Sequence, residues 1–139
     1  MLFYNLLHWG QACAHTGNKF GAVFVRRLMR ILYASNIDLN ADINESVRFS
    51  HYALGVTIHG AAVIGRGTQI EVNVVIGETK PNHVPKIGEN CLIGAGAVLL
   101  GDIRIGNHVK VGANAVVLED VPDYATVVGV PARIVRMNL

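Results

Sequence analysis

Charged and aromatic residues are scarce in this 139-residue chain, and both scarcities narrow the choice of fold. Only 16% of the residues are charged and 6% are aromatic, whereas 51% are hydrophobic, so small and branched aliphatic residues supply the bulk. A helical bundle would need more Leu, Glu and Lys. The composition therefore favours one β-rich domain.

Cysteine is also rare, and long basic or apolar runs are missing. Cys13 and Cys91 cannot make a disulfide framework, which predicts a reducing, cytoplasmic setting. The net charge is +2 and no Lys/Arg run exceeds two residues, so nucleic acid is not an expected partner. Residues 20–33 are apolar but too short to span a membrane, and no secretory signal is recognisable.

The first 35 residues have a helical pattern. Apolar residues recur there at three- and four-residue steps, at Phe20, Phe24, Leu28, Ile31 and Leu32. Three arginines fall mostly on another face, which indicates an amphipathic helix. We expect residues 1–35 to form a helical cap over one open end of the domain that follows. Peripheral membrane contact is the less favoured alternative.

Residues 36–122 have a six-residue apolar period. The repeating position holds Ile37, Ile43 and Phe49, then Ile58, Ile64, Ile70 and Ile76, then Ile87, Ile93, Leu99, Ile105, Val111 and Val117. Two residues earlier there is usually a small or β-branched residue, and residues two apart share one face of a strand. This period predicts an all-β fold, a left-handed parallel β-helix. Residues 123–139 are expected to form a C-terminal turn and tail.

The six-residue period is interrupted twice, and each interruption contains a histidine. Three extra residues follow His51, and a five-residue excursion around positions 80–85 contains His83. Loops at the corners of a solenoid often carry its binding surface. The two interruptions therefore predict where the functional site lies.

Several runs resemble a known family, the hexapeptide acyltransferases. They are the repeats at 87–97 and 105–117, and the tail at 121–133 with its Gly-Val-Pro-Ala-Arg turn. His51 followed by a Gly-Val-x-Ile strand is similar to the serine acetyltransferase branch, including its short members from polysaccharide gene clusters. The resemblance covers residues 36–135. It implies a homotrimer with about four coils per subunit, acetyl-CoA as donor, a hydroxyl acceptor, and active sites between subunits.

The resemblance places His51 at the position of the catalytic histidine. An alcohol needs a general base to attack a thioester, and histidine is the usual one. We expect His51 to take the acceptor proton during direct transfer, without an acetyl-enzyme. Asn36 stands where the serine enzymes have an aspartate that orients this histidine. Its carbonyl could accept an imidazole N–H but carries no charge, so Asp38 and Glu71 are alternative orienters.

The resemblance also suggests residues that bind the acceptor. Ser50 occupies the position at which the serine enzymes hold the amino acid with an aspartate. His83 lies in the loop where those enzymes carry a second histidine. For His83, acceptor binding and simple surface exposure are equally open.

The donor would lie along the groove between subunits. Gly77, Ala95 and Ala113 match positions at which the family lays coenzyme A against the backbone. Lys110 and Arg133 could meet its phosphates, because Lys and Arg are the usual phosphate donors. Alternatively, the alanines are simply the residues that a tight coil accepts.

These observations favour an acetyl-CoA-dependent O-acetyltransferase that acts on a sugar or polysaccharide precursor. The alternative acceptor is L-serine, against which Ser50 and Asn36 argue. A zinc-dependent carbonic anhydrase of this fold would need a closely spaced histidine pair that the sequence lacks, so no metal is expected. A non-catalytic structural β-helix is the remote alternative.

Overall fold

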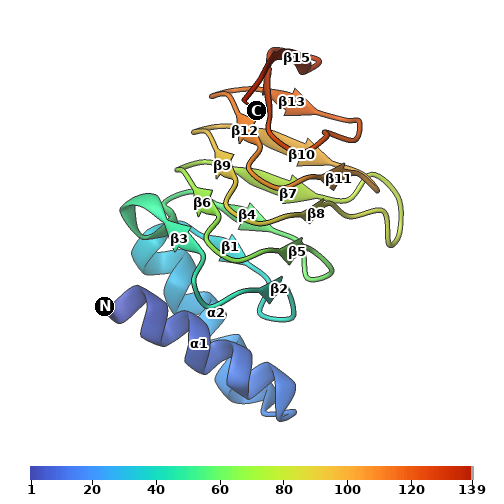
Figure 1. Ribbon diagram of the computed structural model, residues 1–139. Helices are drawn as coiled ribbons and strands as arrows, with labels where there is room; N and C mark the ends of the chain where they lie inside the picture. The colour runs from blue at the N-terminus through green and yellow to red at the C-terminus, as the bar shows by residue number, and fades with distance from the viewer. Residues whose placement is uncertain (139) are drawn as a thin grey trace.

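Strands of two to five residues recur at nearly every six-residue step and wind into a triangular solenoid (Figure 1). The computed structural model describes residues 1–138. The strands form three sheets, one on each side of the triangle, and all neighbours but one pair are parallel. The predicted left-handed parallel β-helix of about four coils is confirmed.

The three sides are called face A, face B and face C. Face A contains β1 (Asn36–Ile37), β4 (Thr57–Ile58), β7 (Val75–Gly77), β10 (Val98–Leu100) and β13 (Val116–Val117). Face B contains β2 (Asp42–Ile43), β5 (Val63–Ile64), β8 (Lys86–Ile87) and β11 (Arg104–Ile105). Face C contains β3 (Arg48–Phe49), β6 (Gln69–Ile70), β9 (Leu92–Ile93), β12 (Lys110–Val111), β14 (Ala125–Val128) and β15 (Arg133–Met137).

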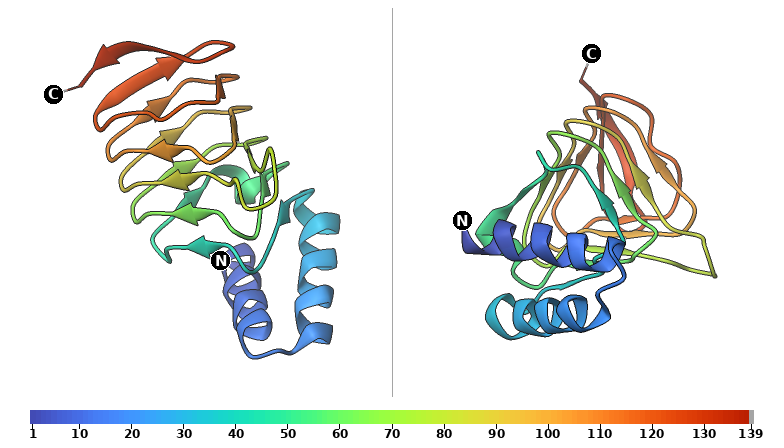
Figure 2. Two further views of the ribbon diagram at one scale, coloured as in Figure 1. Left: turned by 90° about the vertical axis from the view of Figure 1, so that its right-hand side faces the viewer. Right: turned by 90° about the horizontal axis from the view of Figure 1, so that it is seen from below.

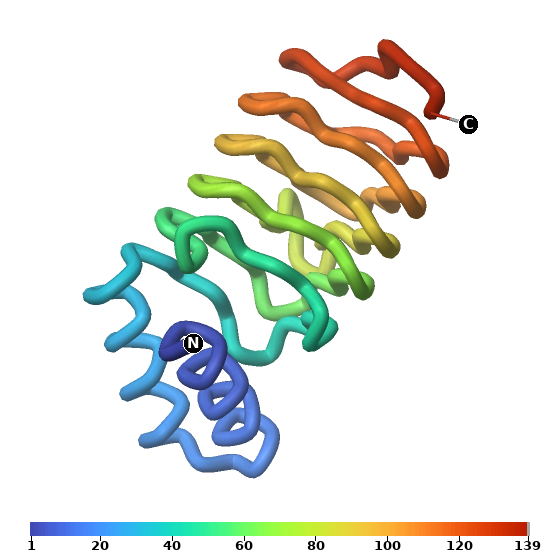
Figure 3. The backbone as a smooth tube through the Cα atoms, turned by 60° about the vertical axis from the view of Figure 1, so that its left-hand side comes forward, coloured from blue at the N-terminus to red at the C-terminus, as the bar shows by residue number. Residues whose placement is uncertain are grey.

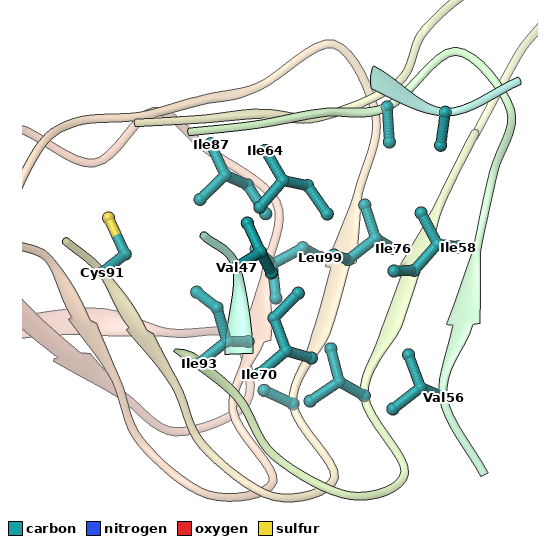
Figure 4. Packing of buried hydrophobic residues seen from close by; sticks show 14 of the residues in the cluster. Val47, Val56, Ile58, Ile64, Ile70, Ile76, Ile87, Cys91, Ile93 and Leu99 are labelled. Carbon is teal, nitrogen blue, oxygen red and sulfur yellow. The ribbon is translucent and has the colours of Figure 1, made fainter. Parts of the chain in front are cut away.

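The core is a single column of aliphatic side chains inside the triangle (Figure 4). In each coil the large residue of the repeat points inward, and residues such as Ile58, Ile70 and Ile76 are fully buried. The small residue two positions earlier, such as Ala62 or Ala97, is buried beside it. Equivalent residues of successive coils pair directly, which stacks like on like.

The corners need left-handed backbone angles. Gly67 has φ +67°, and the next coil places Asn90, with φ +52°, against it. A side chain on Gly67 would meet the Asn90 amide oxygen. Glycine and asparagine are the residues that adopt this conformation most readily. The corner sequence is therefore fixed by backbone angle and by contact with the next coil.

Two helices, α1 (Leu2–His15) and α2 (Lys19–Tyr33), lie at the N-terminal end (Figure 2). Phe3 and Leu7 of α1 enter the core, so the expected cap is present. The apolar stripe recognised in the sequence of α2 is not the side that packs against the protein. Val25 and Met29 are buried instead, and the stripe containing Phe20 and Ile31 is exposed. No helix within residues 1–138 is long and apolar enough to cross a membrane.

The opposite end is closed on all three faces. Strand β14 pairs in parallel with β12, so the stack extends to Val128, beyond the expected limit of residue 122. Strand β15 then pairs with β14 in the antiparallel sense. On face A, the β13 backbone bonds to Gly129 and Ala132, and on face B, Asp120 accepts from the Arg104 N–H.

Candidate functional site

His51 lies in a tight turn, η1 (Ser50–Ala53), at the corner between faces C and A. Three consecutive residues there, His51, Tyr52 and Ala53, have positive φ angles of 48°, 57° and 59°. Each such residue costs roughly 1–2 kcal/mol in a left-handed conformation. Strained backbone of this kind is concentrated at functional sites. The predicted bulge therefore exists, and it exposes the His51 side chain at the corner.

The helical cap holds this turn in place. The Tyr4 hydroxyl accepts a 2.9 Å hydrogen bond from the Phe49 N–H, just before the turn. The ring of Tyr33 lies 5.8 Å from that of Tyr52, measured between centroids. Ala53 is fully buried and anchors the end of the turn. These contacts come from α1, α2 and the core, and they fix a conformation that the turn would not adopt alone.

A small polar surface adjoins the turn on face C. Arg48 donates to Gln69 at 3.3 Å, and Gln69 donates to Glu71 at 2.7 Å. Ser50 and Glu71 directly follow the paired residues of β3 and β6. A cavity of about 250 Å³ opens here between Ser50, Arg48, Gln69 and Tyr4. Sequence reasoning missed Tyr4 and the Arg48–Gln69 pair, although the repeat register makes the latter two neighbours.

The expected orienting residues do not contact His51. Within residues 1–138 the His51 imidazole has no side-chain hydrogen bond or ion pair, and Asn36 has no hydrogen bond to it. Asn36 instead lines a groove of about 250 Å³ at the foot of face A. Asp38 bonds to the amide of Asn40, beyond the far end of β1. Glu71 is thus the carboxylate that the fold brings to the His51 corner.

His83 lies at a different corner. The excursion after β7 projects between faces A and B, away from the turn after β3 (Figure 2). His83 is exposed and its Nδ1 lies 3.1 Å from the Pro81 carbonyl oxygen, whereas Val84 and Pro85 are buried. His51 and His83 of one chain therefore do not meet.

The expected donor residues divide between the same two corners. Ala95 and Ala113 follow β9 and β12, so they stack along the corner that also carries His51. The turns of successive coils lie one above another (Figure 3). Their backbone N–H groups donate no hydrogen bond within residues 1–138. Gly77 instead ends β7, on the side of His83.

The two expected phosphate ligands are exposed. Lys110 lies on face C, one residue before the strand turns toward Ala113. Arg133 lies beside the end cap, 4.0 Å from Glu119 and within hydrogen-bonding distance of the Ala132 carbonyl. Both cations are therefore accessible, and both belong to face C, Lys110 in β12 and Arg133 in β15.

His59 and His108 contact neighbouring side chains, and both cysteines are buried. His59 lies 3.6 Å from Glu78, and the His108 ring stacks on Tyr124 at 4.9 Å. Cys13 and Cys91 are free thiols in the interior, and burial raises the pKa of Cys91. No group of three or more His, Cys, Asp or Glu side chains among residues 1–138 is arranged to hold a metal ion.

Face A differs from the other two faces in chemistry. Its outward strand positions in the upper coils are aliphatic, namely Val75, Val98, Leu100 and Val116. In the same coils the outward positions are Lys86 and Arg104 on face B, and Leu92 and Lys110 on face C. In the lower coils face A carries the polar residues Asn36 and Thr57. Face A is thus the flat side suited to contact with protein.

Comparison with known proteins gives a consistent set of relatives. A family model described as bacterial transferase hexapeptide (six repeats) matches residues 85–119. The serine acetyltransferase of Haemophilus influenzae is 36% identical over 140 residues, covering 97% of this chain and 50% of that protein. The chain thus spans about half the length of the curated relatives it matches.

Solved structures agree. A serine acetyltransferase from Brucella abortus in complex with coenzyme A has a TM-score of 0.92 at 30% identity, covering 97% of this chain and 55% of that one. A serine acetyltransferase from Neisseria gonorrhoeae in complex with serine has a TM-score of 0.87 at 35% identity, covering 92% and 53%. The similarity includes the N-terminal helices as well as the coils, since nearly the whole chain is covered.

Proposed function

Because the chain belongs to the hexapeptide-repeat transferases, in their serine acetyltransferase-like branch, we propose that it is an acetyl-CoA-dependent O-acetyltransferase. The observation that carries this proposal is the exposed His51 on a strained turn, at the head of a corner lined by Ala95 and Ala113. A base and a groove for the donor then share one edge of the solenoid.

His51 acts as the general base. Its imidazole takes the proton from the acceptor hydroxyl while that oxygen attacks the thioester carbonyl carbon. The carbon–sulfur bond then breaks, coenzyme A leaves as the thiol after receiving the proton, and the acetyl ester remains on the acceptor. The free N–H groups of Ala95 and Ala113 supply donors for the amides of the pantetheine arm. Lys110 and Arg133 remain candidates for its phosphates.

The complete site needs a second copy of the chain. We expect face A to turn toward a three-fold axis, because it is the aliphatic face and a thin solenoid gains stability by burying it. In such a ring the corner between faces C and A of one copy adjoins the corner between faces A and B of the next. His51 of one subunit and His83 of its neighbour then line the same cleft.

L-serine is the acceptor that the relatives favour. Proteins similar along nearly this whole chain are named serine acetyltransferases, and one neighbour was solved with serine. The initial expectation of a sugar or polysaccharide acceptor has no such support. One observation keeps it as the second candidate. The polar surface beside His51 carries Arg48, Gln69 and Ser50, and these groups suit a polyhydroxyl ligand.

The test of the base is His51→Ala in a thiol-release assay with acetyl-CoA. Turnover should fall at least about 100-fold while the oligomer and coenzyme A binding persist. His15→Ala, which removes an exposed histidine from α1, is the matched control and should keep full activity. Equal rates for the two variants would reject His51 as the base.

The acceptor is tested with the wild-type protein. Thiol release is compared with millimolar L-serine and with a panel of sugars as the only acceptor. Saturable dependence on serine supports the first candidate. Release that requires a sugar and ignores serine would replace it with the second, without affecting the role of His51.

A further inference from the structure

The N-terminal cap is entirely without acidic residues. The first Asp or Glu of the chain is Asp38, whereas Lys19, Arg26, Arg27 and Arg30 all lie in α2. All four cations are exposed, and none forms an ion pair within residues 1–138. The cap therefore has a concentrated positive charge on a protein whose net charge is only +2.

The outer face of α2 is strongly apolar. Phe20, Phe24, Arg27 and Ile31 follow at steps of four, three and four residues, which places them on one stripe of the helix. Phe20 is 91% exposed, Phe24 59% and Ile31 79%. Large apolar side chains at such exposure mark a surface that is covered in use. Val25 and Met29, on the opposite side, already attach α2 to the rest of the protein.

The positive charge and the exposed apolar stripe together indicate what covers this surface of α2. We infer that α2 docks on an anionic lipid surface, with Phe20, Phe24 and Ile31 inserted among the headgroups and the basic side chains at their level. An interfacial helix of this kind has an apolar stripe beside Lys and Arg and lies in the plane of the bilayer. The long arginine stems can follow the apolar stripe while their guanidinium groups reach the phosphates.

A second copy of the chain fits this stripe less well. A two-fold contact through the stripe would bring Arg27, in its middle, close to its own symmetry mate. No acidic side chain exists in residues 1–37 to neutralise that pair. Anionic headgroups supply the missing negative charge.

The position of the cap gives this docking a defined geometry. The helices lie below the first coil, at the end of the solenoid that carries η1 (Figures 1 and 3). Docking through α2 thus places the end of the solenoid that carries His51 nearest to the lipid, and the end closed by β15 farthest from it.

The experiment is vesicle co-sedimentation of the full chain. Vesicles of phosphatidylcholine alone are compared with vesicles containing 30 mol% phosphatidylglycerol, a proportion that gives a strongly negative surface, roughly as in anionic leaflets. The wild type should sediment with the anionic vesicles, at least about tenfold more than with neutral ones, and high salt should reduce the binding.

Two variants separate the apolar and the basic contributions. Phe24→Ser with Ile31→Ser should lose most of the binding, and Arg27→Glu with Arg30→Glu should abolish the preference for anionic vesicles. Lys86→Glu with Arg104→Glu makes the same change of charge on face B and should bind normally. Circular dichroism checks that each variant keeps its fold.

Three results would overturn the inference. They are no sedimentation of the wild type with anionic vesicles, equal sedimentation with neutral ones, and normal binding by both α2 variants. If the α2 variants instead change the mass of the protein in lipid-free sedimentation velocity runs, the stripe is a contact between copies. Co-sedimentation measures lipid binding alone, so its result is independent of the proposed acetyl transfer.

Discussion

The hydroxyl of Tyr4 and the backbone N–H of Phe49 are joined by a 2.9 Å hydrogen bond across 45 residues of sequence. It links the first turn of α1 to the strand that ends in the His51 turn. We expect Tyr4→Phe to leave the Phe49 N–H without its partner and to cost about 1 kcal/mol in the free energy of unfolding. Urea denaturation measures this cost.

The same substitution also tests whether the cap positions His51. Loss of the hydroxyl should lower kcat more than it raises KM, because the base would be held less firmly. Tyr124→Phe removes a hydroxyl far from the turn and is the control. If kcat were unchanged in Tyr4→Phe, the cap would have only a structural role.

A site shared between subunits predicts complementation. His51→Ala and His83→Ala should each be impaired alone. When equal amounts are unfolded together and refolded, mixed trimers each contain one cleft with both histidines, and about a quarter of all clefts are intact. Thiol release should then recover to about a quarter of the wild-type rate. Full activity of His83→Ala alone would instead show that His83 is not part of the site.

Face A as the subunit interface predicts the effect of a buried charge. In the proposed trimer, Val98→Glu, in the middle of face A, should separate the subunits into monomers in sedimentation velocity experiments, because burying an unpaired carboxylate is costly. Val63→Glu makes the same change at the equivalent position of a face B strand, where the residue is also half-buried. A trimer that survives Val98→Glu but not Val63→Glu would place the interface on face B.

Two glycines with left-handed backbone angles, Gly17 between α1 and α2 and Gly67 at a solenoid corner, predict different losses of stability. Gly17→Ala should cost about 1 kcal/mol, because Gly17 has φ +77° but no neighbour within 4 Å. Gly67→Ala should cost more, because its φ is similar and a side chain would also collide with Asn90. Urea midpoints compare the two. Equal losses would mean that the corner relaxes to admit the extra methyl group.

Burial of Cys91 predicts a pH effect. Burial raises the pKa of this thiol in the folded protein above its ordinary value of 9.0. The unfolded chain therefore loses the proton first, and the stabilisation is present below pH 9 and declines as the pH rises above it. The loss of unfolding free energy between pH 8 and pH 10 should be smaller in Cys91→Ala than in the wild type. Equal losses would assign the alkaline decline to other groups.

The six-residue period predicted most of the fold because it reports directly on burial. The residues at the repeating position, such as Ile64 and Ile93, are inside the column, and His51 is on the corner where the period slips. Counting strands in threes along the chain also assigns His51 and His83 to different corners. That relation follows from the sequence alone.

Other features depend on contacts that no local pattern encodes. Helix α2 carries apolar residues on two sides, and only the end of the solenoid decides that Val25 and Met29 pack inward. The contact of Tyr4 with Phe49 joins segments of different periodicity. The resemblance aligns Asn36 with an orienting aspartate, whereas the structure gives Asn36 no hydrogen bond to His51.

The closed end of the solenoid also limits what the chain can assemble into. A stack of parallel strands has an open edge at its last coil, and such an edge can template another chain. Here the last backbone groups are occupied by an antiparallel strand on face C, by the Gly129–Ala132 turn on face A and by Asp120 on face B. The strand left at the edge of face C is the exposed antiparallel β15, so a further parallel coil cannot continue the stack there without displacing it.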